Sequence, residues 1–185
     1  MGKRNLKLRE NVIRNIVLSE IQNVINENEC PFPNSVVKQP LYHCGKHLNQ
    51  EDFNDVIWFS DKPINHFGEA HRYYVNIENP LVINCQGAGW TDKLWWECCD
   101  EDGFANVDPN DENLTQKAPA EIWKYAQEEG SDESEYGDIP HMVLNGMFGG
   151  KYKSVILKDI GETPNCSVIV NDYVVFSMDD VIMID

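Results

Sequence analysis

A histidine, a serine and two aspartates stand at the ends of short apolar runs in this chain. His43 follows "PLY", Ser60 ends the run "DVIWFS", and Asp159 and Asp172 lie beside apolar runs near the C-terminus. A histidine at a strand end is most often a partly buried structural residue. An acid beside an apolar run is either at an exposed strand end or turned into a cleft, where it can meet a developing positive charge.

The two aspartates are rival candidates for that acid. Period-two alternation places Asp172 on the face of Val174, and it places Asp159 on the face of Val155 and Leu157. Each aspartate therefore lies either at an exposed strand end or in a cleft. We prefer Asp172 slightly, for a reason that depends on the resemblance described below, and we keep Asp159 as a second acid that competes or cooperates with it.

Short runs rich in Val, Ile, Tyr and Phe, bounded by Asn, Asp, Gly and Pro, predict the β-strands that position these residues. Several runs alternate apolar and polar residues, which indicates half-buried antiparallel sheets. Together with the helices described next, they predict an α+β domain. The expected strands cover residues 40–44, 55–60, 73–77, 80–85, 153–160, 166–171, 173–177 and 181–185.

The N-terminal part is expected to be separate from this domain. From Leu8 to Ile25 the apolar residues repeat at intervals of three and four, which predicts an amphipathic helix. Three prolines between Cys30 and Pro40 end that helix. We therefore expect an N-terminal helix and linker over 1–35 and the main domain over 36–185.

The middle of the main domain differs in composition from its two ends. About residues 90–140 the chain is acidic and rich in tryptophan, and helices are predicted near 119–128 and 140–147. The tract "EEGSDESEYGD" at 128–138 is predicted to be a loop or disordered. We expect this acidic insertion to interrupt the strand-rich domain.

Composition narrows the function classes. The formal charge of -16 over 185 residues argues against direct nucleic-acid binding and fits a basic protein partner, although acidity often serves only solubility. Six cysteines without a recognisable leader are expected to be reduced in a cytoplasmic protein, and the lone Cys-x-x-His at 44–47 does not make a zinc site. No apolar run reaches the roughly 18 residues that a membrane-spanning helix needs, so no membrane partner is expected.

The order of several short motifs resembles the ADP-ribosyltransferase superfamily, in its diphtheria-toxin and poly(ADP-ribose) polymerase branch. "LYHCGK" resembles the first motif of that branch, and "IWFSDKPINHFGEA" looks like the second. "YYVNIENPLVINC" is similar to the next strand pair, and "KYKSVILKDIGETPNCSVIVNDYVVFSMDDVIMI" resembles the end of the fold. The match covers residues 40–85 and 140–184, and it implies a split antiparallel β-sheet core with flanking helices.

The resemblance implies that NAD is the substrate and assigns roles to five residues. His43 would hydrogen-bond the ribose of the adenosine half, while backbone groups of Cys44 or Gly45 would hold the nicotinamide carboxamide. Ser60 would hydrogen-bond the carboxamide or ribose, and Phe67 would stack on the nicotinamide ring. Cleavage passes through an oxocarbenium-like state, so a carboxylate must lie near the developing positive charge. No metal is implied.

The sequence departs from the family pattern at three of its site positions. Phe67 stands where many relatives have Tyr, and Cys44 stands where Gly is usual. Asp172 occupies the position of a more common Glu, whereas some small phage members keep their acid near the position of Asp159. The shorter Asp favours a single transfer of ADP-ribose over chain elongation.

The resemblance leaves the acceptor and the biological role open. It implies a mono-ADP-ribosyltransferase with a protein acceptor, including a phage-type effector that acts on a basic or nucleic-acid-binding host protein, with the acidic insertion shaping the acceptor site. The alternative is a non-catalytic acidic protein on a degenerate transferase fold that inhibits a basic partner by imitating nucleic acid. A third reading, an NAD-using RNA-repair enzyme, requires a basic groove that this composition does not offer.

Overall fold

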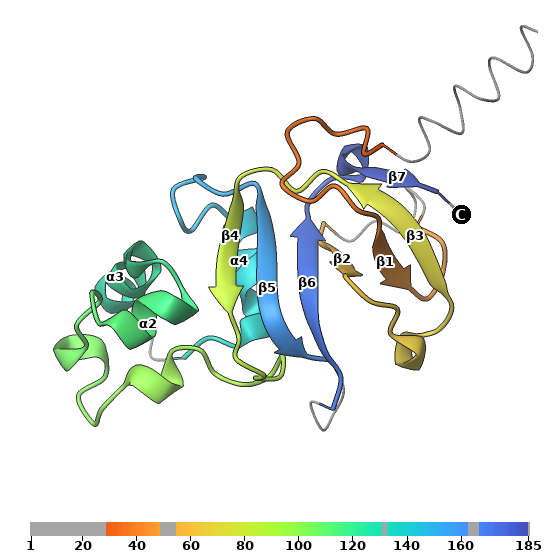
Figure 1. The fold of residues 1–185 in the computed structure, drawn as a ribbon. Helices are drawn as coiled ribbons and strands as arrows, with labels where there is room; N and C mark the ends of the chain where they lie inside the picture. The colour runs from red at the N-terminus through yellow and green to blue at the C-terminus, as the bar shows by residue number, and fades with distance from the viewer. Residues whose placement is uncertain (1–28, 49–54, 131–132, 163–166, 185) are drawn as a thin grey trace, which may run out of the picture.

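Seven strands form a single mixed β-sheet in the computed structural model, which describes residues 29–48, 55–130, 133–162 and 167–184. The order across the sheet is β4-β5-β6-β2-β1-β3-β7 (Figure 1). The centre of the sheet therefore combines the first strands of the chain, β1 and β2, with the late strand β6. The helix predicted over Leu8 to Ile25 lies outside the described residues. The strands are β1 Leu41–Cys44, β2 Ile57–Ser60, β3 Ala70–Val75, β4 Pro80–Asn84, β5 Ser154–Gly161, β6 Ile169–Val175 and β7 Val181–Met183.

Alternation along these strands fills one hydrophobic cluster on each face of the sheet. On β6, Val170 and Val174 pack into the larger cluster, whereas Tyr173 and Val175 pack into the smaller one on the other face. Asp172 has the parity of Val174 and therefore lies on the side of the larger cluster. The predicted face of Asp172 is confirmed, and the α+β class of the fold is also correct.

Two predictions about the strands are wrong in detail. The runs 166–171 and 173–177 do not form two strands, because Ile169–Val175 is a single continuous strand. The sheet is also not wholly antiparallel, since β4 pairs with β5 in parallel. A parallel neighbour requires a long crossover, and the described chain between Asn84 and Ser154 provides it with three α-helices and three short 3-10 helices.

The helical crossover covers one face of the sheet and contributes to its core. Its α-helices are α2 Glu112–Lys117, α3 Ala120–Glu129 and α4 Ile139–Leu144, and α4 lies behind β4 and β5 (Figure 1). The helix predicted near 140–147 is therefore shorter than expected, and α2 was not predicted. Short 3-10 helices occur at η2 Asn65–Phe67, η3 Trp96–Cys98, η4 Phe104–Asn106, η5 Tyr136–Asp138 and η6 Met178–Asp180.

The tryptophans of the predicted insertion are not all surface residues. Trp95 and Trp123 are fully buried in the larger cluster, with ring centroids 5.1 Å apart in an edge-on arrangement, whereas Trp96 is 65% exposed. Tyr136 is also buried, within the tract predicted to be a loop or disordered. Much of the segment is thus core structure, because a parallel strand pair must be covered on its face.

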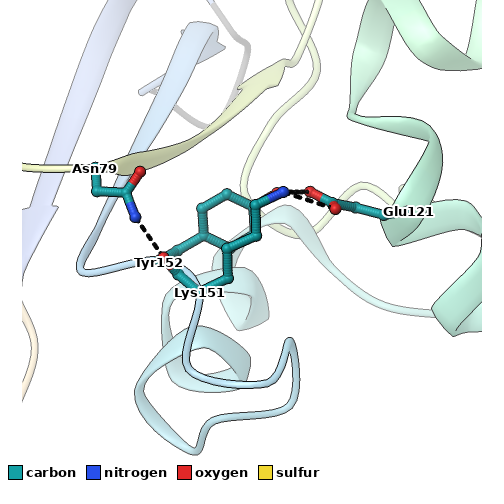
Figure 2. A network of polar contacts seen from close by, with 4 residues as sticks. All are labelled: Asn79, Glu121, Lys151 and Tyr152. Carbon is teal, nitrogen blue, oxygen red and sulfur yellow. Dashed lines mark hydrogen bonds and ion pairs between the residues drawn. The ribbon is translucent and has the colours of Figure 1, made fainter.

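An exposed polar network fastens this crossover to the start of β5. The Lys151 ammonium contacts the two carboxylate oxygens of Glu121 on α3 at 2.5 and 2.7 Å, and the Tyr152 hydroxyl donates to the same carboxylate. The Asn79 side-chain amide donates to the Lys151 carbonyl (Figure 2). Every member of this network has a partner of complementary charge or polarity.

In the part of the chain that the structure describes, none of the helices combines the length and the apolar character needed to cross a membrane.

Candidate functional site

A cleft opens where β1 and β2 diverge. The two strands share the single register pair Tyr42↔Ser60, whereas β1 and β3 share four. The cavity at this opening has a volume of about 100 Å³, which is smaller than most small-molecule sites. Its walls are formed by Tyr42, His43, Cys44, Trp58, Phe59, Ser60, Ile64, Phe67, Trp90, Glu162 and Asp172.

Five of the seven predicted site residues lie in the wall of this cleft. His43 and Cys44 come from β1, Ser60 from the end of β2, Phe67 from η2, and Asp172 from β6. Residues distant in the sequence therefore meet at one place. The other two predicted residues, Gly45 and Asp159, are not part of the wall.

Gly45 lies immediately behind the wall and shapes it through its backbone. It has a positive φ of 123°, and its N–H donates to the Glu69 carbonyl at 2.8 Å. Gly68 also has a positive φ, and a Cβ atom on it would lie 3.1 Å from the Gly45 Cα. Only residues without side chains allow this close approach, which brings Phe67 next to the end of β1.

The ring of His43 is fixed by β2. Its Nδ1 lies 2.9 Å from the Trp58 carbonyl oxygen, and its ring packs edge-on against Phe59 and Tyr73. A carbonyl oxygen only accepts hydrogen bonds, so Nδ1 carries the proton and Nε2 of the neutral ring is an acceptor. The predicted donation from His43 to a ribose would therefore have to come from Nε2 of the imidazolium form.

Ser60 and Phe67 present different surfaces to the cleft. Ser60 is buried, and its hydroxyl donates to the Lys62 carbonyl at 2.6 Å, which leaves the Ser60 oxygen as an acceptor for a ligand. The Phe67 side chain is 49% exposed, so one part of its ring is available to a ligand rather than buried in the core. A half-exposed phenyl ring in the wall of a cleft is well suited to stacking on a planar ligand.

A β-bulge decides which acid of β5 faces the cleft. Leu157 pairs with Asp172 and Ile160 pairs with Val170, so β5 uses one more residue than β6 between these pairs. The extra residue reverses the alternation of all that follow it, and Asp159, at the bulge, has a φ of 52° and is exposed. The predicted face of Asp159 is therefore wrong.

The bulge is held by the side chain of Asn171. Its Oδ1 accepts from the Asp159 N–H at 3.1 Å, and its Nδ2 donates to Asp61 Oδ2 at 2.8 Å. The Asp61 carboxylate also accepts from the Asn171 N–H at 3.0 Å. One amide side chain thus ties the bulge in β5 to the end of β2, beside the cleft.

Beyond the bulge, Glu162 follows the end of β5 and is buried in the wall of the cleft. Its Oε1 accepts from Trp90 Nε1 at 2.8 Å, and the Trp90 ring stacks on Trp58 with centroids 4.6 Å apart. Asp172 is 2% exposed, and its Oδ2 is buried without a hydrogen-bond partner among the described residues. The carboxyl groups of Glu162 and Asp172 are therefore both shielded from water in the wall of the same cleft.

Burial raises the pKa of Asp172 well above its usual range, and the hydrogen bond and charge of Glu162 and the charge of Asp61 raise it further. The indole N–H of Trp90 donates a hydrogen bond to the Glu162 carboxylate. Burial therefore favours the protonated form of Asp172. Such a pair can donate a proton or place negative charge beside a reacting centre, which is typical of functional sites.

The sequence analysis did not identify Glu162 and Trp90 as site residues. Glu162 stands three residues after Asp159 in "DIGE", so an acid near the end of this strand was expected, but the wrong one. The signal that would have distinguished them is the bulge, which shifts register by one residue and has no reliable mark in a single sequence. Trp90 follows Gly87 and Gly89 in "QGAGW", which places it at a turn and not in a strand.

Comparison with known proteins gives little additional information. A stretch of 60 residues is 40% identical to part of the cysteine protease ATG4C of Xenopus tropicalis, and it covers 31% of this chain and 13% of that protease. The chain therefore spans a small fraction of the length of this relative. No protein-family model matches the chain, and no solved structure matches it.

Proposed function

We propose that the protein is a mono-ADP-ribosyltransferase that cleaves NAD in the cleft between β1 and β2 and transfers ADP-ribose to a protein. The supporting observation is that His43, Cys44, Ser60, Phe67 and Asp172, which the family motifs single out, all line one cleft. These residues were selected from sequence motifs alone, and residues selected without regard to the fold would not be expected to line one cleft. The resemblance implied a split sheet, whereas β1 and β2 are hydrogen-bonded neighbours in a single seven-stranded sheet.

In this proposal the nicotinamide ring stacks on Phe67 and its carboxamide meets Ser60 and the backbone near Cys44. The leaving nicotinamide departs as a neutral molecule, so little proton transfer is needed to expel it. The positive charge instead develops on the ribose, and Glu162 places its carboxyl group within the cleft. Asp172 positions Glu162 and supplies a hydrogen bond to the ribose hydroxyls.

The second half of the reaction forms a bond between the ribose carbon and the acceptor. A nucleophilic group of the acceptor replaces nicotinamide and loses its own proton, and the ionised carboxylate of the pair is positioned to take that proton. A basic protein acceptor fits the formal charge of -16, since opposite charge accelerates association. A phage-type effector that acts on a host protein remains part of the proposal.

The partial relative is a protease, but the buried Cys85 is not suited to be a protease nucleophile. Burial raises the pKa of the Cys85 thiol, and the nearby Asp172 and Asp159 carboxylates raise it further. A cysteine nucleophile needs the opposite shift, toward the thiolate. Cys44, the cysteine in the cleft wall, accepts a hydrogen bond from the Ile64 N–H at 3.2 Å.

Incubation of the full chain with NAD labelled in its adenylate half, in the presence of a cell lysate, tests the proposal. We expect free nicotinamide and a labelled protein band, and both should be lost in Glu162→Gln. Glu128→Gln, an exposed change on α3, is the matched control and should retain full activity. Nicotinamide release without labelling would reduce the function to NAD hydrolysis, and the absence of both would favour the non-catalytic acidic binding protein.

A further inference from the structure

The lining of the cleft is rich in aromatic and acidic side chains and contains no Lys or Arg. Of its eleven residues, five are aromatic, two are carboxylic acids, and none is Lys or Arg. Its one basic side chain, His43, has its Nδ1 bonded to the Trp58 carbonyl. Aromatic faces and carboxylates are both groups that attract cations. The aromatic residues are Tyr42, Trp58, Phe59, Phe67 and Trp90.

A second observation points independently to a missing ligand group. The Asp172 side chain is almost completely buried, yet its Oδ2 has no hydrogen-bond partner among the described residues. A buried polar atom without a partner is costly, so such an atom in a cleft wall is expected to be satisfied by what binds there. The described structure provides no cationic side chain for this pair within the cleft wall.

We propose that the cleft selects its ligand by positive charge, and that the acid pair Glu162–Asp172 together with the aromatic wall recognises a planar pyridinium cation over the neutral form of the same ring. This inference rests on the proposed function, because the nicotinamide ring of NAD is such a cation and the ring of its reduced form is neutral. It adds that charge, and not ring shape alone, determines what the cleft holds.

A bound cation and a proton compete for the acid pair Glu162–Asp172. When a cation enters, the fully ionised pair becomes more favourable, so binding releases up to one proton and the affinity rises with pH until the pair is ionised without ligand. The raised pKa of Asp172 favours this release, because ionisation of the pair is disfavoured without a ligand. The titratable groups that face the pair or its surroundings are Asp61, His43, Cys85, Asp159 and Tyr173.

None of these neighbours provides a fixed positive charge. Asp61 and Asp159 are acids, while burial raises the pKa values of Cys85 and Tyr173 and so keeps both neutral. His43, the remaining neighbour, has its Nδ1 hydrogen-bonded to the Trp58 carbonyl.

Two small probes test the proposal without depending on catalysis. 1-Methylnicotinamide is a pyridinium cation, and nicotinamide is the neutral ring with the same carboxamide. Isothermal titration calorimetry of the full chain should give an affinity for the cation that exceeds that for nicotinamide by about tenfold or more. The same titration in two buffers of different ionisation enthalpy should show proton release with the cation alone.

Variants assign the selectivity to the pair. Glu162→Gln keeps the shape and should remove most of the preference for the cation, while the exposed change Glu128→Gln should leave it unchanged. If Glu162→Gln fails to fold, as judged by circular dichroism, Trp90→Phe removes the hydrogen bond to Glu162 but keeps an aromatic ring and should weaken the preference. Equal affinity for the two probes in the unmodified protein, or no binding of either, would overturn the inference.

The same experiments distinguish this inference from the proposed function. Preferential binding of 1-methylnicotinamide without any nicotinamide release from NAD would retain the charge selection and contradict the transferase activity. Release of nicotinamide from NAD, with equal affinity for the two probes, would retain the activity and contradict the charge selection.

Discussion

Two carboxylate sites in this protein are built in opposite ways. At the surface, Glu121 on α3 meets Lys151 and Tyr152, and these hydrogen bonds lower the pKa of Glu121 (Figure 2). In the cleft, Glu162 and Asp172 are buried beside each other, and the pKa of Asp172 is raised. In the surface site, each polar side chain has a hydrogen-bond or ion-pair partner. In the cleft, burial of Asp172 disfavours the charged form of its carboxyl group.

The difference separates a structural role from a functional one. An exposed ion pair adds little to stability because solvent screens it, but it also costs little to keep. A buried acid pair without a cation destabilises the folded protein at neutral pH, so its retention needs another reason. The wall of a ligand cleft provides that reason, and the two sites should respond differently to the same kind of substitution.

The largest expected effect is on activity at the buried pair. Glu162→Gln and Asp172→Asn should each lower the rate of nicotinamide release from NAD by about 100-fold or more, because each removes an acidic group beside the developing charge. Glu121→Gln is the same change at the surface pair and should leave the rate unaltered. Asp159→Asn should have less effect than Asp172→Asn, since Asp159 is exposed outside the cleft wall. A larger loss in Asp159→Asn would return the acid role to that residue.

The next effect concerns the aromatic wall of the cleft. Phe67→Ala should weaken NAD binding about tenfold through loss of the stacking face, whereas Phe67→Tyr should retain it. Since Phe67 is half exposed, neither change should alter the thermal midpoint appreciably. Calorimetry and a thermal melt on both variants measure the two effects. A large loss of stability in Phe67→Ala would show that this ring is a core residue.

A third prediction addresses how the fold supports the buried pair. Asn171→Ala removes the acceptor for the Asp159 N–H and the donor to Asp61, so it should lower the free energy of unfolding by about 1–2 kcal/mol. It should also reduce NAD cleavage, because the bulge that turns Glu162 into the cleft loses its support. Urea denaturation and the nicotinamide assay measure the two losses. Asn145→Ala, at an exposed position after α4, is a control for the change of residue type.

The pH dependence of stability should differ in sign between the two sites. An acid with a raised folded pKa keeps its proton in the native state after the unfolded chain has lost it, so its contribution to stability falls as pH rises from its ordinary pKa through the raised value. Asp172→Asn should therefore gain stability relative to the unmodified protein between pH 5 and pH 8. Urea midpoints at both pH values measure this gain. A constant difference across that range would mean that Asp172 is not buried as an acid.

The smallest effect is expected at the surface pair. Glu121→Gln should lower the thermal midpoint slightly, and the decrease should shrink in high salt because solvent ions already screen the exposed partner Lys151. The lowered pKa of Glu121 gives its contribution the opposite sign, so it is present above the ordinary Glu pKa and lost as pH falls. Melting curves at two salt concentrations measure the decrease. A shift that persists in high salt would indicate a packing role for the Glu121 side chain.

Local pattern determined much of this protein. Apolar runs with turn residues between them predicted strands near each of the observed ones, and alternation assigned Asp172 to the correct face, because strand periodicity is a property of neighbouring residues. The order of the motifs selected His43, Ser60 and Phe67 together with Asp172, and these four line one cleft.

Tertiary structure decided the parts that depend on pairing between distant strands. The bulge exists because β5 must fit β6 across Leu157 and Ile160, and its one extra residue turns Asp159 to solvent and Glu162 into the cleft. The parallel pairing of β4 with β5 likewise buries Trp95 of the crossover against the sheet, where composition alone suggested a surface insertion. Register is a relation between two segments, so neither segment by itself contains it.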